Sequence, residues 1–192
     1  MDRIIKKIFG YPRFYDFCQL VLEGDYSSVI TRTVNAGQEE KILDIGCGTG
    51  YFSQFFNYNY AGVDLNERYV NFAKRYQNEI KNFYVMDAKK ISFPDKSFDK
   101  IILVNFIHHL ADSELELVLK EAQRLAKKEI FIFDMDIERL NFLTPRLLSL
   151  DNGKFIRPLE RQIALIGGIL KIKKSFTFKA PRNLIMHSAI IC

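Results

Sequence analysis

The sequence predicts an α/β fold: a doubly wound, mostly parallel sheet of seven strands, with helices on both faces and an antiparallel hairpin at the C-terminus. Two observations lead to this prediction. Short β-branched and aromatic runs alternate with longer runs of helical period along the chain, a pattern typical of strand–helix–strand units around a parallel sheet. The last two apolar runs are separated only by the segment PRN, a short connection that is typical of a hairpin.

Five runs are predicted to form the parallel strands. They are short and apolar, and the fourth is the most apolar, as expected for a central strand that is buried on both faces. The runs span 41–46, 60–65, 83–88, 99–107 and 129–136. Right-handed crossovers place the first strand near the middle of the sheet. The strand order then reverses beside it, and ligands of such sheets bind there at the carboxyl ends of the strands.

Helices are predicted between these strands and at the N-terminus. In the first 40 residues, one helix ends at Gly24 and the next begins at a cap formed by Asp25 or Ser27. A later helix is predicted to open with a capping box of Ser113 and Glu116. The predicted helices span 13–24, 27–35, 50–57, 67–80, 114–128 and 159–168, and the hairpin joins 170–180 to 183–192.

Composition limits the classes of protein to which the chain can belong. Its 192 residues are 48% apolar and 27% charged, which is ordinary for one globular domain. No apolar run approaches the roughly 20 residues of a membrane span, and the first residues do not resemble a secretion signal, so we expect a cytoplasmic protein. Cys18, Cys47 and Cys192 match neither a disulfide framework nor a metal-ligand pattern, so we expect reduced thiols and no metal site.

Charge is distributed unevenly along the chain. The net charge is +5, and residues 137–192 hold ten Lys or Arg but only three Asp or Glu. The preceding 136 residues hold 18 Lys or Arg and 20 Asp or Glu. The basic C-terminal third could bind an anionic substrate or a nucleic acid, or it could be a solvated face. The sequence leaves these interpretations open.

The segment ILDIGCGTG carries the main functional signal. Gly46, Gly48 and Gly50 follow a predicted strand at alternate positions, and glycines let the backbone turn sharply and approach a ligand closely. A dinucleotide site would place its third glycine one residue later, where the chain has Tyr51. Asp64, at the end of the second predicted strand, can accept both hydroxyl groups of a ribose. This aspartate alone does not distinguish NAD from other adenosine ligands.

The end of the third predicted strand narrows the choice of ligand. Asp87 lies there and is followed by the small residue Ala88. A carboxylate at this position can accept a hydrogen bond from an adenine amino group, and the next backbone N–H can donate to a ring nitrogen. Asp44, Asp64 and Asp87 lie at the ends of three adjacent predicted strands. Together they could hold one adenosine and its tail.

At this point the chain resembles a known family. The segments ILDIGCGTG, GVDLN and VMDAKKISFPDKSFDKIILVNFIHHL, in that order, are similar to motifs of the class I S-adenosylmethionine-dependent methyltransferases, which have a Rossmann-like fold. The closest resemblance is to the branch that includes the ubiquinone and menaquinone methyltransferases. It implies one methyltransferase domain over 1–192, with a helical N-terminal lid (1–40), a cofactor-binding core (41–136), a substrate-cover segment (137–158) and a last helix with the hairpin (159–192).

The resemblance also implies S-adenosylmethionine as cofactor and S-adenosylhomocysteine as product. Asp44 would order the glycine loop near the cofactor's amino group, and Asn105 would contact its methionine portion. Asp64 would hold the ribose, and Leu65 would lie against the adenine. The residues that the resemblance assigns to cofactor binding are Asp44, Gly46, Cys47, Gly48, Asp64, Leu65, Asp87, Ala88 and Asn105.

Methyl transfer from a sulfonium needs orientation more than activation, because the cofactor is already activated. A base helps only when the acceptor atom still holds its proton. His108 and His109 follow the fourth predicted strand, and a histidine there could take a substrate proton near neutral pH. The family often has a histidine at the second position, so His109 is the preferred candidate. Capping or packing ahead of the next helix is the simpler interpretation of both.

Substrate contacts are expected from the variable parts of the chain. The resemblance implies that the N-terminal segment folds over the cofactor, so Tyr11 and Tyr15 are candidate lid residues. Ordinary helix packing is the other interpretation of these two tyrosines. Segment 137–158 combines apolar side chains with positive charges, which would suit an apolar molecule with an anionic group. The same segment could instead be a helical cover over the sheet edge. Its candidate residues are Phe142, Leu143, Arg146, Phe155 and Arg157.

The first hypothesis is therefore a small-molecule methyltransferase. The chain has NFIH after its fourth strand, where DNA and protein-amide methyltransferases of this family carry an Asn/Asp-Pro-Pro-Tyr/Phe tetrad, and it shows no separate nucleic-acid domain. Three alternatives remain open: an RNA methyltransferase that uses the basic C-terminal third, a protein that binds S-adenosylmethionine without turnover, and a nicotinamide oxidoreductase. The sequence indicates neither the acceptor atom nor the oligomeric state.

Overall fold

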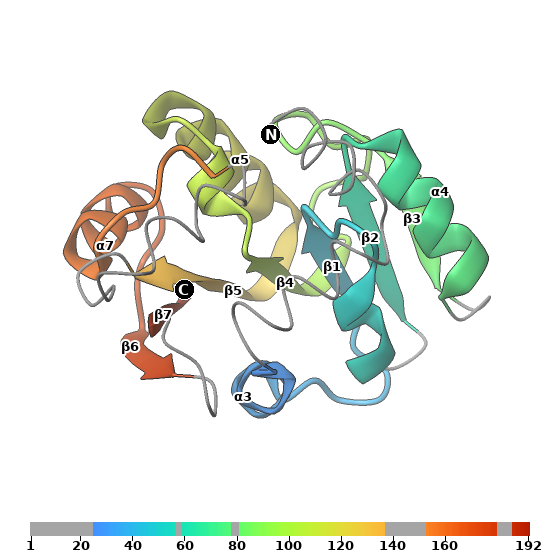
Figure 1. Ribbon diagram of the computed structural model, residues 1–192, viewed down its shortest axis with the longest axis horizontal. Helices are drawn as coiled ribbons and strands as arrows, with labels where there is room; N and C mark the ends of the chain where they lie inside the picture. Colours follow the sequence, from blue (N-terminus) through green and yellow to red (C-terminus); the bar gives the residue numbers. More distant parts are fainter. Residues whose placement is uncertain (1–24, 57–58, 78–80, 137–152, 180–185) are drawn as a thin grey trace, which may run out of the picture.

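The computed structural model describes residues 25–56, 59–77, 81–136, 153–179 and 186–192. Its centre is a seven-stranded sheet in the order β3-β2-β1-β4-β5-β7-β6 (Figure 1). The strands are β1 (Ile42–Ile45), β2 (Tyr60–Asp64), β3 (Asn82–Val85), β4 (Phe98–Val104), β5 (Ala126–Asp136), β6 (Lys174–Lys179) and β7 (Met186–Ile191). Strands β1 to β5 pair in parallel, whereas β7 runs antiparallel to β5 and β6. The predicted fold class and C-terminal hairpin are confirmed, and β4 is the middle strand.

Helical elements cover both faces of this sheet. They are α3 (Ser27–Val34), η1 (Tyr51–Phe55), α4 (Glu67–Tyr76), η2 (Ile107–His109), α5 (Asp112–Leu125) and α7 (Leu159–Gly167). Helices α5 and α7 lie on one side of the sheet and α3 lies on the other (Figure 1). Val70 and Ala73 of α4 belong to the same buried cluster as Ile30 of α3. The sheet is therefore doubly wound, as predicted.

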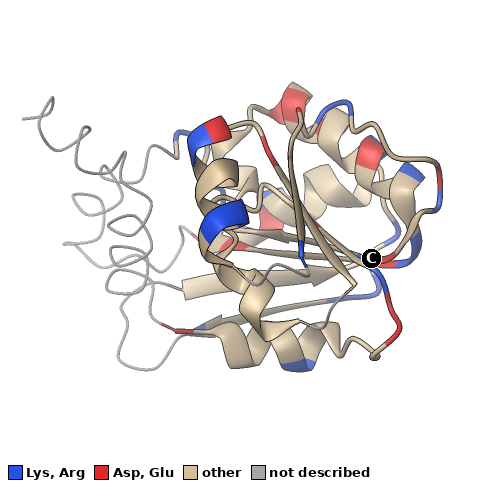
Figure 2. Ribbon diagram, turned by 90° about the vertical axis from the view of Figure 1, so that its right-hand side faces the viewer, with Lys and Arg blue, Asp and Glu red and all other residues tan. Residues whose placement is uncertain are grey.

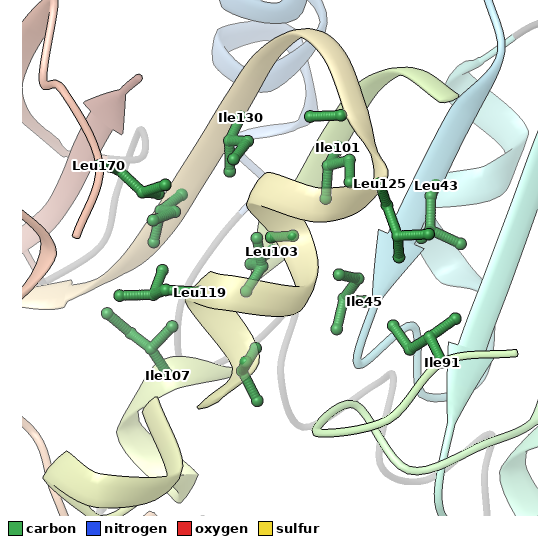
Figure 3. Close-up of a cluster of buried hydrophobic side chains, with 14 of the residues drawn as sticks. Leu43, Ile45, Ile91, Ile101, Leu103, Ile107, Leu119, Leu125, Ile130 and Leu170 are labelled. Atoms are coloured by element: carbon green, nitrogen blue, oxygen red, sulfur yellow. The ribbon is translucent and has the colours of Figure 1, made fainter. Parts of the chain in front are cut away.

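The alternation of side chains along the strands builds a separate core on each face. Leu43 and Ile45 of β1 pack into the cluster beneath α5, together with Ile101 of β4 (Figure 3). Ile42 and Ile102 point to the opposite face and join the cluster beneath α3. All five side chains are at most 2% exposed, and burying each contributes roughly 1.5–3 kcal/mol. These two cores hold the carboxyl ends of the strands in fixed register.

The segment 50–57, predicted as a helix, forms only the short 3₁₀ helix η1. Its closing hydrogen bond runs over three residues, from the Phe56 N–H to the Ser53 carbonyl (3.2 Å). Phe56 is already extended, because the chain must enter the sheet soon afterwards: the Asn59 carbonyl accepts from the Ile42 N–H at 2.9 Å. The helical turn therefore ends at Phe55, two residues before the predicted end.

The start of α5 differs from the prediction by two residues. The N-cap is Ala111, whose backbone N–H donates to a Glu114 carboxylate oxygen at 3.2 Å. The predicted capping box of Ser113 and Glu116 is therefore wrong. An alanine cannot supply the side-chain half of such a cap, so Glu114 provides the contact that fixes the first turn.

The end of α5 comes three residues earlier than predicted. The helix stops at Leu125, because Ala126 already pairs with Phe98 in the sheet. The Lys96 ammonium group donates to the carbonyls of Gln123 (3.0 Å) and Ala126 (2.8 Å). A lysine at this place satisfies backbone acceptors that a helix end leaves open. Tertiary contacts from the β3–β4 connection thus set where this helix ends.

Candidate functional site

The glycine-rich turn that follows β1 adopts a backbone that favours glycine. Gly46, Gly48 and Gly50 have φ angles of 79°, 52° and 75°. A Cβ atom on Gly46 would lie 2.3 Å from the Phe106 ring, so the ring occupies the place of a side chain there. The N–H groups of Gly46 and Cys47 both donate to the Val63 carbonyl, at 2.8 and 3.0 Å. The turn is consequently held against the end of β2.

Gly48 lies at the open part of this turn. A Cβ atom placed on it would meet nothing within 4 Å, in contrast to the crowded Gly46. Its N–H donates to one carboxylate oxygen of Asp64 at 2.9 Å, and the other oxygen accepts from the Asn66 N–H at 2.7 Å. Asp64 therefore ends β2 as predicted and also fixes the glycine turn. The open space above Gly48 is a feature that a close-lying ligand chain would fill.

Asp44 lies under the turn, on the buried part of β1. It is 1% exposed, and one carboxyl oxygen accepts a hydrogen bond from the Tyr60 hydroxyl at 2.5 Å. The other oxygen, Oδ1, is buried and makes no hydrogen bond within the described residues. Burial raises the pKa of this carboxyl to about 7, and the nearby charge of Asp64 adds to the rise, although the Tyr60 hydrogen bond opposes it.

A small cavity joins these groups. Its walls come from the turn, from η1 and from the end of β4, and they consist of Asp44, Gly46, Cys47, Gly48, Thr49, Tyr51, Phe52, Val104 and Asn105. Asn105 follows β4 directly and has a φ of 50°, and its N–H donates to the Phe133 carbonyl at 2.9 Å. Asp44, whose Oδ1 atom has no partner in the described residues, thus contributes a hydrogen-bonding carboxyl group to this cavity. A cationic donor is the partner that such an acceptor favours most.

The ends of β2 and β3 extend the site away from the cavity. Asp64 pairs in register with Val85. Leu65, the first residue after β2, is 69% exposed, and Val85 is 46% exposed. The strand β3 ends at Val85, so Asp87 and Ala88 lie beyond it rather than inside it as predicted. The Asp87 carboxylate accepts from the Lys89 N–H at 2.9 Å. Exposed apolar side chains beside two carboxylates suit a flat base with a ribose.

Comparison with known proteins agrees with this geometry. A family model described as a methyltransferase domain matches residues 43–133. This range contains the glycine turn, the carboxylates of Asp44, Asp64 and Asp87, and the end of β4. Residues 43–133 match a methyltransferase domain of the class I S-adenosylmethionine-dependent type. The methyl donor of this family is S-adenosylmethionine, and the predicted resemblance is confirmed.

Relatives of this methyltransferase domain come from several organisms. The uncharacterized protein MJ1252 of Methanocaldococcus jannaschii is 39% identical over 142 residues, which are 70% of this chain and 55% of that protein. The ubiquinone biosynthesis O-methyltransferase of Pelagibacter ubique is 29% identical over 98 residues, 48% of this chain and 40% of that enzyme. The chain thus spans about half the length, or less, of these curated relatives.

The fold of the domain also occurs in solved structures. An S-adenosylmethionine-dependent methyltransferase from Methanosarcina mazei superposes with a TM-score of 0.70 at 19% identity, covering 84% of this chain and 95% of that one. At such low identity the likeness shows the fold alone.

The two histidines after β4 of the methyltransferase domain have different surroundings. His108 is 2% exposed, and its Nδ1 atom lies 2.6 Å from a carboxylate oxygen of Asp134, whose other oxygen accepts from the His108 backbone N–H at 3.2 Å. His109 is half-buried, and its ring centre lies 4.1 Å from that of His108. Burial alone would raise the pKa of Asp134, but the charge and hydrogen bond of His108 lower it below its usual value.

Arg157 closes over this part of the methyltransferase domain. It is 7% exposed, and its guanidinium donates to the carbonyls of Ile107 (3.0 Å) and Leu110 (2.6 Å) and to the Asp112 carboxylate (2.7 Å). We predicted that Arg157 would offer its positive charge to a substrate. Its guanidinium group is instead engaged by these protein carbonyls and by the Asp112 carboxylate. Phe155 in the same segment is 38% exposed, so it remains accessible.

The charge of the basic C-terminal third is partly neutralised. Arg161 pairs with Asp112 at 2.6 Å, and Lys173 pairs with Glu129 at 3.2 Å. Figure 2 shows acidic and basic residues interspersed over the covering elements of the described part. These pairs favour the solvated-face interpretation over a continuous basic surface for nucleic acid.

Several predicted residues lie outside the described residues of the methyltransferase domain: Tyr11, Tyr15, Cys18, Phe142, Leu143 and Arg146. Cys47 and Cys192 are described, and neither forms a disulfide. In the described ranges, no cluster of three or more His, Cys, Asp or Glu could hold a metal ion, and no helix there is long and apolar enough to cross a membrane.

Sequence reasoning missed three contributors to the site. Tyr60, Val85 and Asp134 were not singled out, because each becomes relevant only through a partner on another strand or loop. Asp134 had a visible signal: it is an acidic residue inside an otherwise apolar strand. A buried acid in such a place needs a partner, and a histidine is a common one.

Proposed function

We propose that the chain is an S-adenosylmethionine-dependent methyltransferase that methylates a small molecule. The observation that carries this proposal is the glycine turn between Asp44 and Asp64, with an open cradle above Gly48 and an unpartnered buried carboxyl oxygen beside it. An ammonium group, a ribose and an adenine are the three groups that this series of strand ends would recognise. The family to which the domain belongs supports the same choice of cofactor.

The cofactor contacts follow from this arrangement. Gly46, Cys47 and Gly48 would pass beneath the methionine portion, with Asp44 facing its ammonium group and Asn105 closing the far wall. Asp64 would accept from the ribose hydroxyl groups, in addition to the two backbone N–H groups that it already binds.

The adenine would occupy the outer half of the site. Leu65 is exposed beside Val85 and would lie against the base. Asp87 would accept from the adenine amino group, and the Ala88 N–H would donate to a ring nitrogen. The apolar contact and the polar edge together would select adenine over a base that lacks the amino group.

When bound, S-adenosylmethionine supplies a methyl group that is already activated on a sulfonium sulfur. The protein then has to orient the acceptor in line with that bond and exclude water, and orientation alone can be worth roughly 7–11 kcal/mol. For an acceptor that holds a proton, His109 is the candidate base because it is partly accessible. His108 is buried against Asp134, and we propose that it positions the loop that carries His109.

A small-molecule acceptor is supported by two observations. The Pelagibacter relative is named as an enzyme of ubiquinone biosynthesis, and the chain lacks the tetrad that amide-methylating relatives carry after β4. The internal ion pairs of Arg161 and Lys173 leave less free positive charge for RNA. The exposed ring of Phe155 suits an acceptor with an apolar part.

The deciding experiment is incubation of the protein with methyl-labelled S-adenosylmethionine and a metabolite extract, followed by mass spectrometry. Label in one small molecule, with S-adenosylhomocysteine formed in equal amount, is the expected result. Cofactor binding without label transfer to any metabolite would indicate a protein that binds the cofactor without turnover. Label recovered only in added RNA would contradict the small-molecule assignment, and binding of NAD in place of S-adenosylmethionine would contradict the whole proposal.

A further inference from the structure

Asp44 and Tyr60 form a buried pair at the base of the candidate cofactor cavity. Asp44 pairs in register with Gly62, and Tyr60 lies two residues earlier on β2, on the same face. The tyrosine ring therefore runs along the strand toward Asp44, and its hydroxyl donates to the Oδ2 atom at 2.5 Å. Both side chains are 1% exposed. The pair is thus part of the rigid sheet rather than of a loop.

Only half of the Asp44 carboxyl is satisfied by this contact. Oδ1 is buried and makes no hydrogen bond in the described part of the chain, and Asp44 lines the cavity together with the glycine turn. A buried carboxyl oxygen without a partner is unfavourable whether or not it carries a proton. No Lys, Arg or His lines this cavity among the described residues, so a cation on the ligand would be the first positive charge to reach Asp44.

This inference rests on the proposed function, because it concerns how the cofactor is recognised. We propose that Tyr60 is a positioning residue which, through Asp44, couples binding of the cofactor's ammonium group to the loss of one proton. Below neutral pH, the buried carboxyl of the free protein holds that proton. On binding, the proton leaves Oδ1 for solvent, and the ammonium group takes its place as the hydrogen-bonding partner.

The electrostatics around Asp44 agree with this coupling. Burial raises the pKa of Asp44 to about 7, the Tyr60 hydrogen bond lowers it, and the charge of Asp64 raises it. Burial also raises the pKa values of Tyr60 and of Cys47, which neighbours Asp44 in the turn, well above their usual values. Both groups are therefore neutral, and among the described residues the Tyr51 hydroxyl is the other titratable group in the cavity wall.

Removing the Tyr60 hydroxyl should have a defined consequence. A hydrogen bond to the ionised form favours that form, so Tyr60→Phe should raise the pKa of Asp44 and move proton release to higher pH. If the substitution raises the pKa of Asp44 by about one pH unit, S-adenosylhomocysteine should bind the variant about tenfold more weakly at pH values below that pKa. We expect S-adenosylhomocysteine to bind Tyr60→Phe about tenfold more weakly than wild type at pH 6.5 and nearly as tightly at pH 8.5.

The test is calorimetric titration with S-adenosylhomocysteine from pH 6 to 8.5, in buffers of different ionisation enthalpy, which reports the protons released. 5′-Methylthioadenosine, which lacks the ammonium group, is the control ligand and should bind without proton release. Tyr84→Phe removes a hydroxyl from β3 and should behave like wild type. Asp44→Asn keeps the shape of the carboxyl group but has neither a titrating proton nor a negative charge. We therefore expect this variant to bind S-adenosylhomocysteine more weakly and to release no proton on binding.

The outcomes separate this inference from the proposed function. Proton release that is half-maximal near pH 7, and at higher pH in Tyr60→Phe, would support the coupling. Binding of S-adenosylhomocysteine with the same pH dependence in wild type and Tyr60→Phe would overturn it while leaving the cofactor assignment standing. Proton release that persists in Asp44→Asn would also overturn it. Failure of wild type to bind either ligand at any pH would overturn both proposals.

Discussion

The Asp134 carboxylate binds His108 twice, through the imidazole Nδ1 atom at 2.6 Å and through the backbone N–H at 3.2 Å. Both side chains are at most 2% exposed. Gly153 closes over the ring, because a Cβ atom there would lie 2.2 Å from the imidazole Cδ2. The contact joins the loop after β4 to β5 and to the segment that returns over the sheet. His108 thus links these three segments of the chain.

Removal of this imidazole should destabilise the protein strongly. His108→Ala leaves the buried Asp134 carboxylate with backbone N–H donors but without its charged partner, and breaking a buried pair in this way typically costs about 3–5 kcal/mol. Urea unfolding of His108→Ala at pH 7 measures this cost. Lys120→Ala is the matched control, because it removes one partner of an exposed ion pair of the same 2.6 Å length and should cost less than about 1 kcal/mol.

The pH dependence of stability should change sign in the same variant. In wild type the pKa of Asp134 is lowered, so its contribution is present above the unfolded-state pKa and is lost as the pH falls through the folded-state value. Without His108, burial should raise that pKa, so stability should decrease as the pH rises. A difference in unfolding free energy that stays constant from pH 3 to 7 would contradict the pairing.

Asp64→Ala should cost most of the affinity for S-adenosylmethionine. The substitution removes the acceptor proposed for the ribose and also releases the Gly48 N–H, which is bound at 2.9 Å. We expect at least a tenfold rise in the dissociation constant, measured by calorimetry. Asp95→Ala, at a side chain that is 74% exposed, should leave affinity unchanged. A loss within about threefold, roughly 0.7 kcal/mol, would place the cofactor elsewhere.

Alanine at Gly48 and at Gly46 should have different effects. At Gly48 the added Cβ meets nothing within 4 Å, but the residue must keep a φ of 52°. Gly48→Ala should therefore cost about 1–2 kcal/mol of stability. It should also weaken cofactor binding, because the added methyl group occupies the open space above residue 48. At Gly46 the Cβ meets the Phe106 ring, so Gly46→Ala should lose considerably more stability. Gly167→Ala, with ordinary contact at 3.5 Å, is the control. Thermal unfolding and calorimetry separate the two effects, and equal stability losses at Gly46 and Gly48 would contradict the geometry.

Glu40 should stabilise the protein only above acidic pH. Hydrogen bonds from Lys128, from the Gly37 backbone N–H and from Lys100 lower its pKa from 4.5 to about 2. The contribution is therefore complete above pH 4.5 and disappears as the pH falls toward 2. Glu40→Gln should cost about 1 kcal/mol at pH 7, after allowance for solvent screening, and nothing at pH 2. Chemical unfolding at both pH values tests this, and an equal cost at both would refute it.

The sequence by itself determined the sheet, its approximate strand positions and the cofactor class. These features depend on short-range patterns: apolar runs of the right length, three alternate glycines, and acids at strand ends. The glycine turn is the clearest case, because its positive φ angles are a local property that only a few residue types tolerate. Local patterns also explain the errors at the ends of α5, where contacts from distant parts of the chain set the boundaries.

Only the tertiary structure decided which polar groups are paired inside the site. Tyr60 meets Asp44 across 16 residues of sequence, His108 meets Asp134 across 26, and Arg157 meets Asp112 across 45. None of these pairs has a sequence spacing that predicts it, because each is created by strands and loops that come together only in the folded sheet. The sequence could identify acids and bases near the cofactor, but burial and partners decide which of them carry a free charge.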